Sequence, residues 1–141
     1  MKFGMTAIRF WNRRDKMVPK FRAWEPDTKF MNDQVRVTSN RFGDGEILVE
    51  ATDGFGWIEV KPEYLMQSTG LKDKNGVEIF EGDIVAIKYS ESGYHYYEKI
   101  VFENGTFTAG DEDWLYNIKD YCVVCGNIYE NPELLEPANE N

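Results

Sequence analysis

Two cysteines, one histidine and a short acidic run are the residues of this 141-residue chain whose types and spacing could do chemistry. Cys122 and Cys125 form a CxxC pair, a spacing that elsewhere binds zinc or performs thiol redox chemistry. His95 could act as a general base, and the run Asp111–Asp113 could offer oxygen ligands to a cation.

Each of these features also has a purely structural interpretation, which we favour. A zinc site needs further ligands, and the sequence has no other cysteine and no other histidine. Cys122 and Cys125 fall in a strand-like run, where positions three apart point to opposite faces, so we expect two free thiols. His95 stands among tyrosines that pattern a strand, and Asp111–Asp113 lacks the spaced ligands of a calcium loop. We therefore expect no enzymatic activity, no metal and no other cofactor.

The charge of the chain is distributed unevenly. The net charge is −9, but residues 1–41 hold 10 Lys/Arg and 4 Asp/Glu, whereas residues 42–141 hold 6 and 21. In the basic front the cations alternate with aromatic residues, a combination that suits single-stranded nucleic acid. The alternative is that this front docks on the acidic body of the same chain or of a second copy. We favour docking and expect a homo-oligomer, with nucleic acid as the secondary partner.

Apolar residues alternate with a period of two in most segments, which is typical of β-strands. The expected strands are residues 34–38, 46–50, 57–60, 77–80, 84–87, 94–97, 99–103, 106–108 and 121–125. Asn75–Gly76 and Asn104–Gly105 each stand between two such runs, which predicts two tight hairpins. Short strands at this spacing favour a small barrel or sandwich.

Helix is expected in two places only. Glu63–Gln67 could form one turn after Pro62, because proline is tolerated at the first helical position. Asn131–Leu135 resembles a capped final turn, with Asn131 as the N-cap. Residues 137–141 are expected to be a disordered tail, and no apolar run is long enough to cross a membrane.

An apolar-Arg-x-Trp pattern occurs twice near the start of the chain, in Ile8–Trp11 and in Phe21–Trp24. Two amphipathic strands of one hairpin would produce this echo, and so would a duplicated or extended front end. Two copies do not establish a repeat, so both interpretations stay open.

Several motifs, taken in order, resemble the YopX family. They are Phe21–Trp24 (FRAW) with Lys29–Met31 (KFM), then Leu65–Gly76 (LMQSTGLKDKNG), Glu78–Val85 (EIFEGDIV) and Gly126–Leu135 (GNIYENPELL). The resemblance covers roughly residues 20–136. It implies a small β-rich protein carried by temperate phages and prophages, with an SH3-like barrel as its core. No biochemical activity is established for the family.

The resemblance also gives expected boundaries and structural roles. We expect a basic aromatic extension over residues 1–19, an N-terminal β segment over 20–62 and an SH3-like barrel over 63–136. Residues 1–19 precede the usual start of the family pattern, and they partly mimic its opening motif. In the motifs, Gly82 should permit a sharp turn or bulge and Asp83 should accept hydrogen bonds from turn amides. Tyr129 and Leu134 should plug one barrel end.

Together these observations predict a cytoplasmic accessory protein of a phage or prophage that binds a partner macromolecule. The partner would be a second copy or a phage or host protein, with no membrane involved. The alternative is a nucleic-acid-binding protein that uses residues 9–24. The candidate binding surface consists of basic and aromatic side chains: Arg9, Trp11, Arg13, Arg14, Arg22, Trp24, Trp57, Tyr94, Tyr96, Tyr97 and Trp114.

Overall fold

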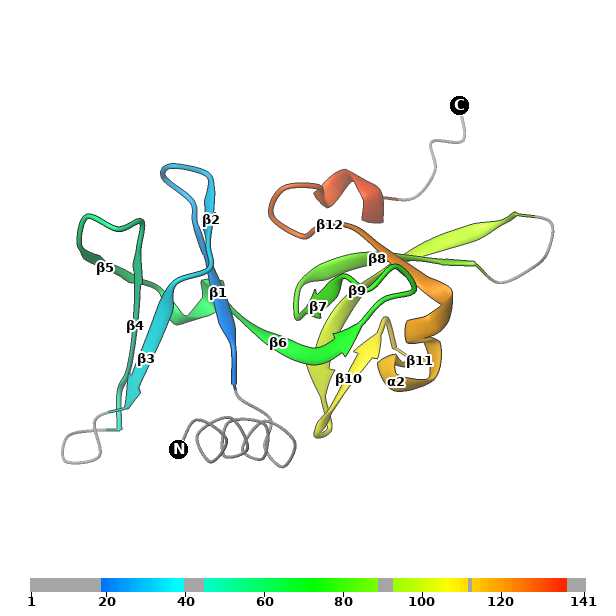
Figure 1. Ribbon diagram of the computed structural model, residues 1–141, viewed down its shortest axis with the longest axis horizontal. Helices are drawn as coiled ribbons and strands as arrows, with labels where there is room; N and C mark the ends of the chain where they lie inside the picture. Colours follow the sequence, from blue (N-terminus) through cyan, green and yellow to red (C-terminus); the bar gives the residue numbers. More distant parts are fainter. Residues whose placement is uncertain (1–18, 40–44, 89–92, 112, 137–141) are drawn as a thin grey trace, which may run out of the picture.

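The computed structural model describes residues 19–39, 45–88, 93–111 and 113–136, which fold mainly into antiparallel strands (Figure 1). In chain order the strands are β1 (Phe21–Glu25), β2 (Phe30–Asn32), β3 (Val35–Ser39), β4 (Ile47–Thr52), β5 (Trp57–Val60), β6 (Leu65–Lys72), β7 (Glu78–Phe80), β8 (Asp83–Lys88), β9 (His95–Glu103), β10 (Thr106–Ala109), β11 (Asp113–Trp114) and β12 (Cys122–Asn127). The helical segments of these residues are short: η1 (Pro62–Tyr64), α2 (Leu115–Ile118), η2 (Lys119–Tyr121) and η3 (Pro132–Leu135). The expectation of a mainly β protein with little helix is confirmed.

The N-terminal half is a small sandwich in which β1 packs against the sheet β3-β4-β5. The register of that sheet places a set of apolar side chains on one face, because directly paired residues of antiparallel strands share a face. The set is Val35, Val37, Ile47, Val49, Ala51, Ile58 and Val60. Ala23 of β1 covers the middle of this face, where Val49 and Ala51 are buried.

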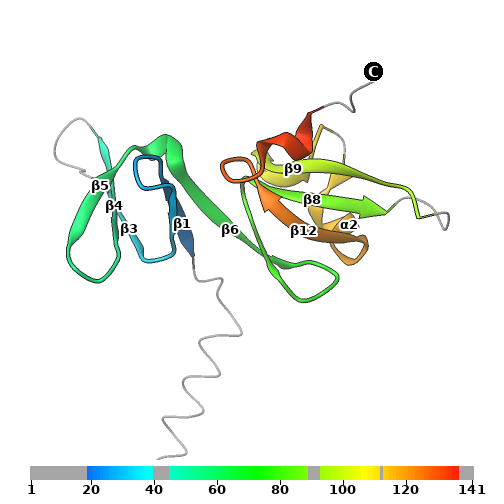
Figure 2. The same ribbon diagram turned by 90° about the horizontal axis from the view of Figure 1, so that it is seen from above.

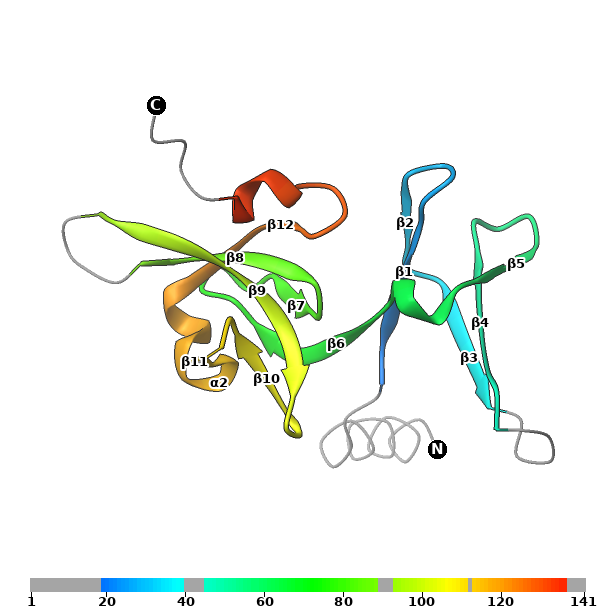
Figure 3. The same cartoon turned by 180° about the vertical axis from the view of Figure 1, so that it is seen from behind.

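Strand β6 belongs to both halves of the molecule. Its first residues, Leu65–Gln67, pair with β1, and its last residue, Lys72, pairs with β7 after a register shift. Figure 3 shows β6 running from the N-terminal sandwich into the C-terminal half. The boundary that we expected near residue 63 therefore lies just before a strand that both halves share.

The C-terminal half is a five-stranded sheet, in the order β11-β10-β9-β8-β12, that curls into a half-barrel (Figure 2). Its concave side encloses a continuous apolar core. The fully buried members of that core come from five different elements and are Ile79, Val85, Ile100, Leu115 and Cys122. Of the two densest apolar runs in the sequence, Ile84–Ile87 lies in β8, an interior strand of this sheet, whereas Cys122–Cys125 lies in β12, its edge strand.

Both Asn-Gly pairs lie between antiparallel strands as predicted, but only Asn104–Gly105 forms a tight two-residue turn. Asn104 and Gly105 have φ values of 53° and 81°, the left-handed pair that a two-residue turn between β9 and β10 requires. At the second hairpin, the Asp73 carboxylate accepts the N–H groups of Asn75 and Val77 and also that of Val124 in β12. The β6–β7 turn is thereby tied to the last strand of the half-barrel.

Gly82 and Asp83 take the roles expected of them at the start of β8. Gly82 has a φ of 86°, and a Cβ atom there would lie 3.0 Å from the Met66 sulfur. The Asp83 carboxylate accepts the N–H of Phe80 at 2.7 Å, as expected of a residue that caps a turn.

The two expected helical turns are only partly correct. Leu65–Gln67 continues as strand and not as helix, because these residues pair with β1 and their backbone groups are satisfied there. A 3-10 turn does follow Asn131, but the Asn131 side chain makes no capping bond. Its carbonyl oxygen instead accepts the N–H of Asn127 and closes the preceding turn.

Helix α2 and turn η2 were not predicted. No residue at their start provides a side-chain cap, and the N-cap position is occupied by Trp114. Leu115 is completely buried in the core of the half-barrel. Tertiary packing of this one side chain, and not local propensity, therefore accounts for the helix.

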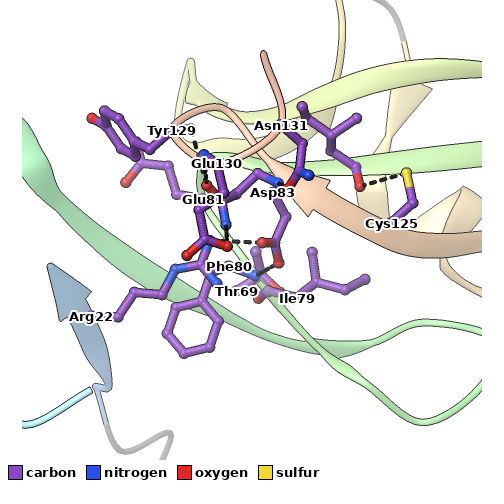
Figure 4. A network of polar contacts seen from close by, with 12 residues as sticks. Arg22, Thr69, Ile79, Phe80, Glu81, Asp83, Cys125, Tyr129, Glu130 and Asn131 are labelled. Atoms are coloured by element: carbon purple, nitrogen blue, oxygen red, sulfur yellow. Dashed lines mark hydrogen bonds and ion pairs between the residues drawn. The ribbon is translucent and has the colours of Figure 1, made fainter. Parts of the chain in front are cut away.

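A buried ion pair joins the two halves. The Arg22 guanidinium of β1 donates to the Asp83 carboxylate of β8 at 2.7 Å and lies 4.6 Å from the centre of the Phe80 ring (Figure 4). The side chains are 14% and 3% exposed. Burial raises the pKa of Asp83, and the nearby Arg22 cation and the Phe80 N–H oppose that rise. The Arg22 Nε is buried without a hydrogen-bond partner among the described residues.

An aromatic stack makes a second contact between the halves. The rings of Trp24 and Tyr129 are 5.6 Å apart and nearly parallel, and the Tyr129 hydroxyl donates to the backbone oxygen of Glu63. Tyr64 lies tilted against Tyr129. We expected Tyr129 to plug one end of the barrel. Its ring instead packs against Trp24 of β1, in the junction between the two halves. Leu134 is half-buried in η3, which lies against β9.

Removing the Arg22 cation from the junction between the halves should lower the stability of the protein considerably. We expect Arg22→Met to lower the free energy of unfolding by about 3 kcal/mol at pH 7, because the Asp83 charge is left buried and unpaired. The pKa of Asp83 is already raised in the folded state, so folding favours its protonated form and the loss should shrink as the pH falls toward about 4. Urea unfolding at several pH values measures this.

Lys20→Met is the matched control, because Lys20 precedes β1 and its ion pair with Glu78 is exposed at the lysine. We expect this variant to lose less than about 1 kcal/mol. Equal losses for both variants, or a loss in Arg22→Met that does not depend on pH, would contradict the importance assigned to the buried pair.

Candidate binding surface

The residues proposed from the sequence as a binding surface do not gather in one place. Arg9, Trp11, Arg13 and Arg14 lie outside the described residues. Arg22 and Trp24 are buried in the junction between the halves. The others are distributed over the β3-β4-β5 sheet and the half-barrel, and they are Trp57, Tyr94, Tyr96, Tyr97 and Trp114.

Trp57 lies on the outer face of the β3-β4-β5 sheet. The Arg36 guanidinium stacks over its ring at 4.1 Å and donates to Glu50 at 2.9 Å. The arginine therefore covers one face of the indole, and the side chain keeps 43% of its surface exposed.

The aromatic residues of the half-barrel point in different directions. Tyr94 and Trp114 are more than half exposed, at 68% and 60%. The Tyr97 ring meets the His95 ring edge-on, whereas the Tyr96 hydroxyl donates to the Asp113 carboxylate at 3.3 Å. Tyr96 and Tyr97 are consecutive in β9, so their side chains lie on opposite faces of the sheet.

A groove of about 380 Å³ opens between the β1–β2 hairpin and the β4–β5 hairpin, which lie side by side in Figures 1 and 3. We call this the hairpin groove. Its lining consists of Glu25, Thr28, Phe30, Asn32, Asp53, Gly56 and Ile58. Phe30 and Ile58 are its apolar side chains, and each keeps about half of its surface exposed.

The hairpin groove is an open end of the N-terminal sandwich. Ile58 pairs with Ala51, so its side chain lies on the apolar face that β1 covers further along. At the opposite end of the same face, Val37 and Ile47 are 38% and 50% exposed. The two sheets of the sandwich are thus too short to close over their own core.

Asn32 is a polar residue of the groove that the sequence analysis missed. It is only 5% exposed and lines the groove, and no hydrogen bond to its side-chain amide is found among the described residues. Among the described residues, Arg22 Nε is the one fully buried side-chain nitrogen or oxygen without a partner, so the Asn32 amide keeps some access to water and can bond a molecule in the groove. Nothing in the sequence marks it, because an asparagine at the end of a three-residue strand usually belongs to a turn.

The rim of the groove is acidic. Glu25 and Asp53 each accept one backbone N–H of their own turn, from Asp27 and Phe55. No basic residue is among the described residues that line the groove. The rim is therefore suited to a cationic partner.

A second, acidic hollow lies in the half-barrel. It includes Tyr96, Glu98, Asp111 and Asp113, and Glu98 packs directly over Gly110. Burial raises the pKa of Glu98, and the charges of Asp111 and Asp113 raise it further. The described residues contain no group of three or more His, Cys, Asp or Glu arranged to hold a metal ion.

Both cysteines are free thiols. Burial raises the pKa of the Cys122 thiol to about 11, with further contributions from Asp73 and Asp120, and burial also raises the pKa of Cys125. Thiol redox chemistry needs the thiolate, which these shifts disfavour. The thiols donate to the backbone oxygens of Lys119 and Ile84, and β12 has a register shift between Val124 and Gly126.

The fold defines this chain as a mainly β protein in which a small sandwich and a half-barrel share one strand. The family model described as YopX protein matches residues 20–136. The chain therefore belongs to the YopX family. None of the helices among the described residues is long and apolar enough to cross a membrane.

Two crystal structures show the same fold. Protein EF1440 from Enterococcus faecalis aligns at 33% identity over 86% of this chain and 100% of its own, with a TM-score of 0.59. Protein yopX from Bacillus subtilis aligns at 21% identity over 83% of this chain and 98% of its own, with a TM-score of 0.53. No curated protein matches the chain.

The burial of Glu98, together with the like charges around it, should make the protein less stable at neutral pH. The folded pKa of Glu98 is raised, so its charged form destabilises the fold above that pKa, and the cost is relieved as the pH falls through it. We expect Glu98→Gln to raise the melting temperature by about 1–2 °C at pH 7 and to have almost no effect near pH 4. Thermal unfolding at both pH values checks this.

Glu103→Gln, an exposed site at the end of the same strand, is the control. It should change the melting temperature little at either pH. A Glu98→Gln variant that melts lower than the parent at pH 7 would show that Glu98 is held by favourable contacts and not opposed by its acidic neighbours.

Proposed function

We propose that this protein is a phage- or prophage-encoded accessory protein that acts in the host cytoplasm as a non-catalytic protein-binding or assembly module. The observation that carries the proposal is the open apolar end of the N-terminal sandwich. Phe30 and Ile58 continue the buried face into solvent, and the β4–β5 turn carries Phe55, which is 96% exposed. Adjoining exposed apolar side chains of this kind mark interaction surfaces.

A second copy of the chain is the partner that the charge distribution favours. The basic front and the acidic body are complementary, and complementary charges speed and orient association. The curled sheet of the half-barrel would serve as a rigid platform, as the barrel of an SH3-like domain does. The fold by itself implies no activity.

Nucleic acid is the alternative partner, because the cations and aromatic residues of residues 9–24 resemble a single-strand-binding combination. Within that range, however, Arg22 and Trp24 make contacts inside the fold, in the junction between the two halves. The alternative therefore rests on Arg9, Trp11, Arg13 and Arg14.

Placing a charge in the groove should weaken self-association. Ile58→Glu puts a carboxylate on the apolar face, and we expect it to weaken self-association at least tenfold. Sedimentation velocity over a range of concentrations, read against the monomer mass of 16.4 kDa, measures this. Val77→Glu is the matched control, because Val77 is 47% exposed and lies in the β6–β7 turn, away from the groove. A parent protein that stays monomeric, or equal effects of both variants, would argue against assembly through this surface.

Salt dependence separates the two candidate partners. If the front binds nucleic acid, the affinity for single-stranded DNA should fall steeply with salt and disappear in the triple variant Arg9→Glu, Arg13→Glu, Arg14→Glu. If the module binds protein through apolar contacts, we expect weak DNA binding that this variant does not change specifically. Fluorescence anisotropy with a labelled oligonucleotide at two salt concentrations measures both.

A further inference from the structure

We propose that the hairpin groove binds an extended peptide segment, and that its occupant is residues 8–14 (Ile-Arg-Phe-Trp-Asn-Arg-Arg) of a second copy of this chain. The inference rests on the proposed assembly function and names the segment and the residues that recognise it. Residues 1–19 precede the part of the chain that matches the family model, so this contact would be a feature of this chain's own extension.

Asn32 is the group that points to a peptide. Its side chain lines the groove, and its amide has no hydrogen-bond partner among the described residues and keeps some access to water. A carboxamide carries a carbonyl acceptor and an NH₂ donor side by side. The two together match the N–H and C=O of an extended peptide backbone, whereas most small apolar ligands would leave both unsatisfied at a cost.

The shape and charge of the groove select what the peptide carries. The groove is lined by Phe30 and Ile58 and has room for a large apolar side chain, and Glu25 and Asp53 also line it. The groove should therefore prefer an aromatic residue with a cation on each side.

Residues 8–14 carry this pattern. In an extended strand, side chains two apart lie on the same side, so Arg9, Trp11 and Arg13 all face one way. Trp11 would enter between Phe30 and Ile58, and the two arginines would meet the acidic rim. The front of one copy in the groove of the next is a head-to-tail contact, which produces chains or closed rings.

Mixing two defective variants tests whether front and groove form one contact. The first carries Arg9→Glu, Trp11→Ala and Arg13→Glu with an intact groove, and the second is Ile58→Glu with an intact front. We expect each variant alone to be monomeric and their equimolar mixture to form a 1:1 dimer in sedimentation velocity. Asn32→Leu, which keeps the side-chain size but removes the amide, should weaken association of the parent at least fivefold. Circular dichroism checks that each variant is folded.

The outcomes distinguish this inference from the proposed function. If the parent associates and Ile58→Glu does not, yet the mixture stays monomeric, the groove binds protein but residues 8–14 are not its occupant. If Asn32→Leu and Ile58→Glu both associate as the parent does, the groove is not the contact. If the parent is monomeric at every concentration, assembly with a second copy is itself wrong, and this inference fails with it.

Discussion

The buried ion pair between Arg22 and Asp83 is the contact on which the arrangement of the two halves depends. A guanidinium and a carboxylate removed from water must stay together, because either one alone would be an uncompensated buried charge. The same carboxylate also fixes the turn before β8, so the pair connects the first strand of the sandwich to the first long strand of the half-barrel. The unpartnered Arg22 Nε shows that the hydrogen-bonding capacity of the arginine is not fully used among the described residues.

In this arrangement the strands of the N-terminal sandwich are too short to cover its own apolar face. Strand β1 covers only the middle of the apolar face, since the strand is five residues long and β6 leaves the sandwich after its first residues. Apolar side chains therefore remain exposed at both ends of the face. One of these ends is the hairpin groove, where the Asn32 amide and an acidic rim accompany the exposed apolar residues.

Much of the fold could be predicted from local sequence. Strands β3–β5, β7–β10 and β12, the Asn104–Gly105 hairpin and the Gly82–Asp83 turn follow from alternation and from backbone conformations that a few residue types permit, whereas β2, β6 and β11 were not among the expected strands. Residues 65–67 were misassigned because their helical appearance is local, whereas their pairing with β1 lies more than forty positions away in the chain. Helix α2 was missed for the reverse reason, since only the burial of Leu115 in a distant core accounts for it.

The candidate site was much less predictable. In the sequence, aromatic and basic residues suggest a binding surface. The same side chains can also stabilise the fold, as Arg22 does in its ion pair and Trp24 in its ring stack. Asn32 became a candidate only through its burial beside a hairpin that is distant in sequence. The mainly β character, the turns and the separation of a basic front from an acidic body follow from residue type and near neighbours, so local sequence is enough to predict them. Which charges are paired and which apolar residues stay exposed depends on the folded arrangement, because burial depends on segments that the chain brings together from far apart.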